Sequence, residues 1–581
     1  MNISNLYKIN IGEFLEILLG KIPIADHLNA SDKEVMEVGL FELTRKNIRD
    51  IVSKNDEALD YLIEKHNIGL SVRRAKLARF QRSIPMRVSK SFKSDILAHQ
   101  KKLEPILKIS EKRTQYLSLI PTSDEKKESL SQFEASIKLY KAELLSKMLP
   151  TFFFGSQFRC QFPFSARKRH AYILGSSGSG KTELIKLFVY SDIKQRLGNL
   201  VLDPHGDLVE DLSRLKANHK NIIYLSAEFG KIGYYFKLNP FDHEYHNKSD
   251  HIKQAFISVK CQELLNAFAI VMQTEFTGNM SRMVFNILQV LLHHKGMNLN
   301  DFLKCLRPAT SEPYERLARQ HPLENVRLYF EHDFNLKTLS ITKQSVLTRF
   351  ENALANYHLA QIFDCEKSSF NLKKSLNQGK SILINASQGL LGEQGCRMLG
   401  SFLLSELTTL ALQKASIPEQ FRKPWMIYID ECQNFLTPRI DKILSEARKY
   451  GLHLTMANQF LNQIDDTRLR ASILANTNVK CLGLSSNKDF DTMSKELGLK
   501  NKTIPKLGKG RFVVKVGSYD ALAIQAYNFL IGNKNNSYIG SKDHFNRLNF
   551  NLTHYYMKTL TDQEKKRIPK QPAVAKIEKL L

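Results

Sequence analysis

The chain has 581 residues, of which 43% are hydrophobic and 9% aromatic, and it carries a formal net charge of +27. Since one hydrophobic core cannot organise this length, roughly three or four folding units are expected. The charge argues against an enzyme of small neutral metabolites and favours a polyanionic partner, either nucleic acid or an anionic membrane face. A lysine-rich surface that serves only solubility is the alternative.

The seven cysteines are scattered along the chain, and none of them forms a Cys-x-x-Cys pair. An odd number at irregular spacing argues against a disulfide framework or a zinc site and indicates a reducing compartment. The N-terminus lacks the features of a signal peptide, and no transmembrane segment is recognised by its apolar length. We therefore expect a cytoplasmic protein, and peripheral docking at the inner face of the membrane stays open.

Residues 1–150 are predicted to form a basic, mostly helical N-terminal region. Between Ser71 and Arg82, arginines and apolar residues recur at helical spacing, so one face can pack while another stays cationic. That cationic face is either simply solvated or binds a polyanion. Aromatic residues follow from Phe152 to Phe164, and we expect them to pack as a linker onto the next domain rather than to form an interface or a membrane patch.

The segment from His170 to Val189 predicts a short apolar strand, a glycine-rich loop and an amphipathic helix. The loop has a glycine, four residues and then Gly-Lys-Thr, which is typical of phosphate-binding loops. Its glycines permit a tight turn whose N–H groups point at a polyphosphate, placed at the positive end of the helix. The residues expected to bind ATP are Gly175, Ser176, Ser177, Gly178, Ser179, Gly180, Lys181 and Thr182.

Two of these side chains have specific expected roles. Lys181 would reach the β- and γ-phosphates of ATP, and the Thr182 hydroxyl would be a ligand of Mg²⁺. An ordinary glycine- and serine-rich turn between a strand and a helix is the alternative.

Beyond the loop, apolar runs predict buried parallel strands, and amphipathic periodicity predicts helices between them. The predicted strands are 199–203, 221–225 and 381–385. The predicted helices are 255–272, 281–294, 341–362 and 398–415. No convincing strand interrupts residues 248–372, which indicates an all-helical insertion.

The apolar strand Trp425–Ile429 ends in two carboxylates, Asp430 and Glu431. Asp430 would hold the Mg²⁺ shell, and Glu431 would orient and deprotonate the attacking water. A carboxylate pair at a strand end is common by chance. It gains weight because it shares a chain with a phosphate loop.

A predicted helix from Leu444 ends at Gly451 and leads into a strand that Asn458 and Gln459 follow. The Gln459 amide can hydrogen-bond the γ-phosphate or the attacking water, or it is an ordinary strand-end residue. Arg448 is either an exposed helix charge or the cation that a neighbouring subunit inserts to neutralise the transition state.

From about Phe164 to Val516, the order of these motifs resembles the conjugative coupling proteins and their VirB4-like and HerA-like relatives among the hexameric DNA-pumping ATPases. The motifs that carry the resemblance are 175–182, 202–208, 387–392, 429–433, 445–451 and 457–459. The resemblance implies an α/β fold: a RecA-like P-loop NTPase with a mostly parallel sheet and an inserted helical domain, assembled as a ring around DNA. Membrane-anchored coupling proteins usually start with transmembrane helices, and none is recognised in this chain.

The resemblance also implies roles for particular residues. Lys181, Thr182, Asp430 and Glu431 would carry the ATPase chemistry. Gln459 would be the γ-phosphate sensor, and Arg448 the finger that reaches the next subunit. Asp203 and His205 match a family motif near the site without a definite step.

These features predict four parts of the chain. They are the N-terminal region 1–150, an ATPase domain of 151–247 and 373–530 that ends in a hairpin near 508–526, the helical insertion 248–372 and a basic tail 531–581. The expected function is ATP-driven translocation of DNA without sequence preference, by a homo-oligomer and most simply a hexamer, in type IV secretion. A relaxase or a secretion-channel protein would recruit it. The alternatives are a VirB4-like secretion ATPase and an ATP-switched scaffold with little turnover.

Overall fold

The computed structural model describes residues 35–42, 157–216, 219–272, 276–435, 444, 447–499, 507–518, 521–526, 551 and 554–555. The chain forms two compact units. The first comprises Met1–Pro163 and Ser518–Ile524, and the second comprises Phe164–Gly517 and Gln525–Leu581. The second unit therefore contains both the phosphate loop and the acidic pair.

In the first unit, strand β1 (Val35–Glu42) pairs antiparallel with β2 (Gln157–Pro163). Residues 35–42 therefore differ from the mostly helical prediction for the N-terminal region. The reason is tertiary: a strand is stabilised by its cross-strand partner, and here the partner lies far along the chain. The arginine-rich stretch 71–82 and the aromatic residues 152–154 lie outside the described residues.

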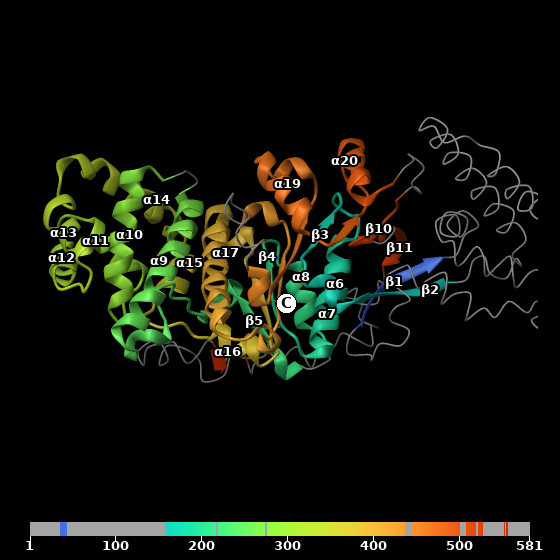
Figure 1. The fold of residues 1–581 in the computed structure, drawn as a ribbon, viewed down its shortest axis with the longest axis horizontal. Helices are drawn as coiled ribbons and strands as arrows, with labels where there is room; N and C mark the ends of the chain where they lie inside the picture. The colour runs from blue at the N-terminus through green and yellow to red at the C-terminus, as the bar shows by residue number, and fades with distance from the viewer. Residues whose placement is uncertain are drawn as a thin grey trace, which may run out of the picture. The chain divides into compact units, whose positions relative to one another are not determined.

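The second unit is built on a mostly parallel sheet, as predicted, with strands in the order β10-β9-β3-β8-β7-β4-β6-β5 (Figure 1). Only β10 runs antiparallel to its neighbour β9 among these strands. The strands are β3 (Ala171–Leu174), β4 (Gly198–Asp203), β5 (Ile222–Ser226), β6 (Ser381–Asn385), β7 (Trp425–Ile429), β8 (Leu452–Asn458), β9 (Val479–Leu482) and β10 (Arg511–Val516). Every residue of β3 to β8 is buried, which explains why most of these strands are apolar runs, although β8 also buries His453, Thr455 and Asn458.

Helices cover this sheet and connect its parallel strands. They are α6 (Phe164–Arg167), α7 (Lys181–Gln195), α8 (Asp207–Ser213), α16 (Leu372–Asn377), α17 (Gln388–Leu412), α19 (Thr467–Asn476) and α20 (Asn487–Leu497). The last strand, β11 (Leu522–Ala526), follows β10 where the hairpin is predicted, and the Ala526 N–H donates to the Gly510 carbonyl at 2.8 Å.

A run of helices lies between β5 and β6, and Figure 1 shows it grouped beside the sheet and next to α17. Its helices are α9 (Asp250–Met272), α10 (Gly278–His293), α11 (Leu299–Leu306), α12 (Glu312–Arg319), α13 (Glu324–Leu328), α14 (Ser340–Leu354) and α15 (Tyr357–Phe363). The single helix predicted over 341–362 is two helices. Asn356 separates them because its side chain accepts the Leu359 N–H and caps α15.

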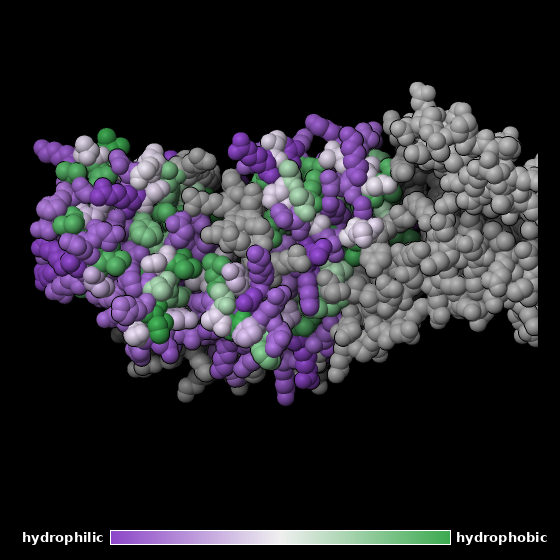
Figure 2. All heavy atoms as spheres, in the orientation of Figure 1, coloured by the Kyte–Doolittle hydropathy of each residue, from purple (hydrophilic) through white to green (hydrophobic). Residues whose placement is uncertain are grey.

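Helix α9 is the one helix in the described part of the chain whose length and hydropathy would allow it to cross a membrane. It is instead the core of the helical run: the ring of Phe268 contacts those of Phe302, Phe350 and Phe402. Its buried Lys260 pairs with Glu406 of α17 at 2.8 Å. On the face drawn in Figure 2, apolar residues over these helices lie scattered among hydrophilic ones, which fits a core helix beneath a polar surface.

Candidate active site

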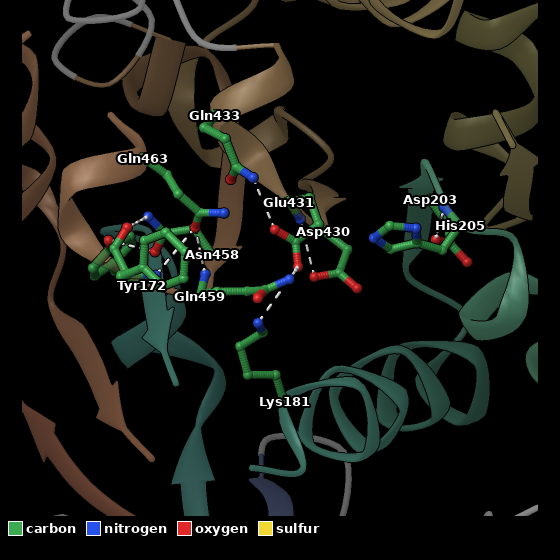
Figure 3. A network of polar contacts seen from close by, with 11 residues as sticks. Tyr172, Lys181, Asp203, His205, Asp430, Glu431, Gln433, Asn458, Gln459 and Gln463 are labelled. Atoms are coloured by element: carbon green, nitrogen blue, oxygen red, sulfur yellow. Dashed lines mark hydrogen bonds and ion pairs between the residues drawn. The ribbon is translucent and has the colours of Figure 1, made fainter. Parts of the chain in front are cut away.

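The parallel strands bring the predicted site residues to one edge of the sheet. Strands β3, β8, β7 and β4 lie next to one another in this order and run parallel. The segments that follow their carboxyl ends therefore lie side by side. These segments are the phosphate loop after β3, Gln459 after β8, the acidic pair after β7 and Asp203 at the end of β4. Figure 3 shows Lys181, Gln459 and the acidic pair close together, with Asp203 and His205 to one side of them.

The phosphate loop is a tight turn between the buried strand β3 and the first turn of α7. Gly180 has a φ of 99°, and a Cβ there would lie 3.0 Å from the Gly510 Cα, so only glycine fits. The Ser176 N–H donates to the Leu484 carbonyl at 2.6 Å, and the Ser179 carbonyl accepts the Gly510 N–H at 2.7 Å. The chain beside β9 and β10 therefore fixes the shape of the loop.

Lys181 and Glu431 form an ion pair inside the site. The Lys181 Nζ lies 3.5 Å from the Glu431 Oε1, and each side chain is only 7% exposed. Lys181 is the first residue of α7, where the helix dipole favours an anion. The structure thus places the loop lysine and the second carboxylate in one cluster.

Two amides hold the Glu431 carboxylate. Gln459 donates to its Oε1 at 3.0 Å, and Gln433 donates to its Oε2 at 2.8 Å. Burial alone would raise the pKa of Glu431, but these hydrogen bonds and the charge of Lys181 lower it below its ordinary value. Glu431 therefore stays ionised at neutral pH.

The backbone of Glu431 is strained. Its φ of 45° and ψ of 55° are left-handed, a conformation that few residues other than glycine adopt. The strain turns the carboxylate back toward the loop, where Gln433, two residues later, can reach it. Sequence reasoning missed Gln433 as a site residue, although it lies within the Asp-Glu-Cys-Gln motif.

Asp430 is 5% exposed and accepts the Glu431 N–H at 3.0 Å. Burial raises its pKa to about 7, and the negative charges of Asp203 and Glu431 add to this effect. Such a carboxylate gains from a nearby cation. Together with the half-buried Thr182 hydroxyl, it offers the hard oxygen donors that Mg²⁺ prefers, so these residues fit that ion.

Asp203 shapes the turn after β4. Its two oxygens accept the N–H groups of His205 at 2.9 Å and Val209 at 3.2 Å, which ties the strand to the start of α8. Burial raises the pKa of Asp203 despite these bonds. The exposed His205 ring is directed toward the acidic pair in Figure 3, and its charge helps to lower the pKa of Glu431.

Gln459 is fixed from behind by Gln463, whose Oε1 accepts the backbone N–H groups of Gln459 at 2.9 Å and Phe460 at 3.1 Å. The preceding Asn458 accepts the Tyr172 hydroxyl of β3 at 2.6 Å. The tip of β8 is therefore tied to the strand that leads into the loop, and the Gln459 amide is held against Glu431.

Arg448 is not brought into this cluster. It lies in a 3₁₀ helix, η11 (Ala447–Tyr450), just before β8, and its side chain lies outside the described residues. Strand β8 rises about 20 Å from Leu452 to Asn458, since each residue adds roughly 3.3 Å. The Arg448 backbone is therefore at the amino edge of the sheet, and the phosphate loop of the same chain is at the carboxyl edge.

The hydrogen bonds from the Gln459 and Gln433 amides to Glu431 give a first prediction. Gln459→Ala should lower kcat for ATP by about 10- to 100-fold, because a hydrogen bond to a charged group contributes roughly 1.5–3 kcal/mol. ATP affinity should change little, since Lys181 and the loop remain. Steady-state kinetics and nucleotide binding check this. The exposed Gln262→Ala is the matched control, and unchanged kcat in Gln459→Ala contradicts the prediction.

Among solved structures, the chain is similar to the plasmid coupling protein TrwB in complex with ADP and Mg²⁺, at 16% identity and a TM-score of 0.44 over 65% of this chain and 89% of that one. It is also similar to VirB4 of Thermoanaerobacter pseudethanolicus, at 14% identity and a TM-score of 0.44 over 64% and 94%. No curated protein matches the sequence.

The family model described as type IV secretory system conjugative DNA transfer matches residues 122–511. This match covers more than half of the chain and includes the phosphate loop, the acidic pair, Arg448 and Gln459. The chain therefore belongs to the conjugative DNA transfer family of type IV secretory systems.

Proposed function

We propose that this chain is the ATP-driven motor of conjugative DNA transfer and that it works as a ring of identical subunits that moves DNA. The observation that carries the proposal is the cluster of Lys181, Glu431 and Gln459 at the carboxyl edge, with Arg448 on the opposite edge of the same sheet. The phosphate loop and the carboxylate beside it support nucleotide hydrolysis. The distance of the Arg448 backbone from this cluster supports assembly of subunits, in which Arg448 would act on the site of a neighbour.

ATP would bind at residues 175–182, with its phosphates against the loop N–H groups and the Lys181 ammonium. Thr182 and Asp430 would hold Mg²⁺, and this ion would neutralise charge that develops on the phosphates. A phosphate group at Lys181 would draw its ammonium away from Glu431. Since the charge of Lys181 helps to lower the pKa of Glu431, this shift makes Glu431 a stronger base when substrate is present.

Glu431 would then accept a proton from the attacking water while Gln433 and Gln459 hold its carboxylate in place. Gln459 would also contact the γ-phosphate, since its amide lies beside Glu431. Hydrolysis would change its partners, and the tie between Asn458 and Tyr172 would pass the change to the sheet.

The transition state of phosphoryl transfer is commonly stabilised by an arginine in addition to the loop lysine and Mg²⁺. The Arg448 backbone lies before β8, at the edge of the sheet opposite the phosphate loop of its own chain. We infer that Arg448 acts on the site of a neighbouring subunit. A ring of subunits, taken as a hexamer from the family resemblance, satisfies this geometry because each amino edge can face the carboxyl edge of the next subunit.

The charge distribution supports DNA as the substrate and indicates where it binds. Residues 248–372 contain 14 Lys and Arg against 12 Asp and Glu, so they account for only +2 of the net charge of +27. The cationic excess lies in the remaining parts of the chain. Contacts to phosphates without base readout predict binding that weakens steeply with salt.

A second prediction tests the phosphate site itself. Lys181→Ala should weaken ATP binding by about 10- to 100-fold, because a charge-assisted contact to phosphate contributes roughly 1.5–3 kcal/mol. Calorimetric titration with a non-hydrolysable ATP analogue measures this. Lys194→Ala, an exposed lysine near the other end of α7, is the matched control. Intact ATP binding in Lys181→Ala would mean that the site is assigned to the wrong residues.

The experiment for the proposed function is displacement of a third strand from a DNA triplex. ATP should drive displacement, and DNA should stimulate hydrolysis in a salt-sensitive manner. Hydrolysis that is indifferent to DNA favours a VirB4-like secretion ATPase. A scaffold that only switches shape on ATP would show little turnover with or without DNA.

A further inference from the structure

We propose that Arg422 is a positioning residue that holds Arg448 in place. This inference rests on the proposed function, in which Arg448 serves a neighbouring site. Arg422 follows a 3₁₀ turn, η9 (Glu419–Phe421), in the connection between α17 and β7, and nothing in its local sequence suggests chemistry.

The Arg422 guanidinium bridges two segments of backbone. Its Nε donates to the Ile417 carbonyl at 2.7 Å and to the Lys414 carbonyl at 3.0 Å. Its Nη1 donates to the Lys449 carbonyl, directly after Arg448. Its Cζ also lies 5.3 Å from the centre of the Tyr450 ring. Arg422 thus contacts both residues that follow Arg448.

Only arginine suits this position. Its planar fork presents several donors in fixed directions and stacks on aromatic rings, whereas a lysine ammonium is a single point charge on a flexible stem. The hydrogen bonds go to carbonyls just after the end of α17 and in η11, so the side chain fixes η11 relative to the end of α17. This is what a segment that presents a catalytic cation requires.

The segment is also fixed to β7. The Trp425 N–H donates to the carbonyl of Gly451, the residue after η11, at 2.8 Å. The Lys414 ammonium lies 3.2 Å from the centre of the Trp425 ring and donates to the Lys423 carbonyl at 2.8 Å. Arg422 therefore belongs to a rigid corner at the amino edge, and Trp425, the only tryptophan of the chain, reports on it.

The same corner connects to the nucleotide edge through α17. The Gln388 N–H at the start of α17 donates to the Pro204 carbonyl, and the Ala386 N–H donates to the Asp203 carbonyl, both at 2.9 Å. The helix is broken at Gly392, whose φ of 71° and ψ of 166° are not helical, and its segment from Glu393 to Leu412 is about 30 Å long, at 1.5 Å per residue. Arg422 thus ties η11 to the C-terminal end of this long segment, and the short segment before Gly392 contacts the turn after Asp203.

The test compares Arg422→Ala with Arg448→Ala and with their double variant. Arg422→Ala should lower ATP turnover by about 10- to 100-fold, as expected for a misplaced catalytic group, and should leave ATP affinity within about twofold. In the Arg448→Ala background it should cause no further loss, because Arg422 acts through Arg448. If the loss of ATP turnover in the double variant equals the product of the two single losses, the residues act independently and the proposal is overturned.

Subunit mixing gives a readout that a merely structural role would not produce. Arg422→Ala subunits keep Lys181 and Glu431, and Glu431→Gln subunits keep Arg448 and Arg422. Coexpressed in one oligomer, these two poorly active variants should turn over ATP faster than either does alone. The exposed Arg316→Ala is the matched control and should show full turnover alone.

Two further measurements keep the outcome decisive. Trp425 emission checks that each variant retains the corner, and Arg422→Lys replaces Arg422→Ala if the alanine variant does not fold. Full turnover in Arg422→Lys overturns the proposal. If Arg448→Ala complements Glu431→Gln but the Arg422 variant does not, the role proposed for Arg422 is wrong and the shared site still stands. If neither complements, the shared site itself is wrong.

Discussion

Arg448→Ala is expected to lower ATP turnover by about 10³- to 10⁵-fold, the range that an arginine finger contributes in related phosphoryl transfer. The physical reason is charge: the transition state gathers negative charge on the phosphate oxygens, and Lys181 and Mg²⁺ alone do not neutralise it. ATP affinity should be nearly unchanged, because η11 lies at the amino edge, away from the phosphate loop of its own chain.

The decisive form of this experiment combines two defective variants. Arg448→Ala subunits have an intact loop and acidic pair, and Glu431→Gln subunits have an intact Arg448, so a mixed oligomer should regain turnover at the interfaces that pair the intact halves. Lys449→Ala, an exposed cation next in sequence, is the matched control. Normal turnover in Arg448→Ala alone would show that its role is not catalytic.

Glu431→Gln is expected to lower hydrolysis by about 10²- to 10⁴-fold, the contribution of a positioned general base. ATP binding should persist and even strengthen, because the ion pair that holds Lys181 at 3.5 Å from Glu431 is lost and the ammonium is free to meet the phosphates. Single-turnover hydrolysis and equilibrium binding of ATP separate the two effects.

Glu393→Gln is the control for this variant, since the exposed Glu393 side chain forms an ion pair with Arg397, one turn along α17. Loss of ATP binding in Glu431→Gln would mean that Glu431 supports the fold of the loop rather than the chemistry. Wild-type hydrolysis would favour an ATP-switched scaffold over a motor.

The strands of the second unit were largely predictable because their signal is local. Strand β7 is a continuous apolar run, and β6 has three consecutive apolar residues at its centre, as burial on both faces of a parallel sheet favours. Strand β9 was not predicted: it has four residues, and Lys480 interrupts its apolar pattern. Its place beside β3 comes from parallel pairing, which one chain segment does not reveal.

The candidate site was predictable in its parts but not in its connections. The phosphate loop and the acidic pair carry recognisable spacing, and the direction of β8 already implies that Arg448 and Gln459 lie at opposite edges. The left-handed backbone of Glu431, which lets Gln433 reach its carboxylate, leaves no trace in the sequence. Nor does Arg422, whose partners are backbone carbonyls brought together only by the fold.

The central claim is that hydrolysis occurs at a site shared between subunits and is coupled to DNA. The most direct measurement is ATPase activity per subunit as a function of protein concentration, with and without single-stranded DNA. Activity per subunit should rise steeply with concentration as rings assemble, and DNA should shift the rise to lower concentration. Activity per subunit that is flat across dilution and unaffected by DNA would contradict the account.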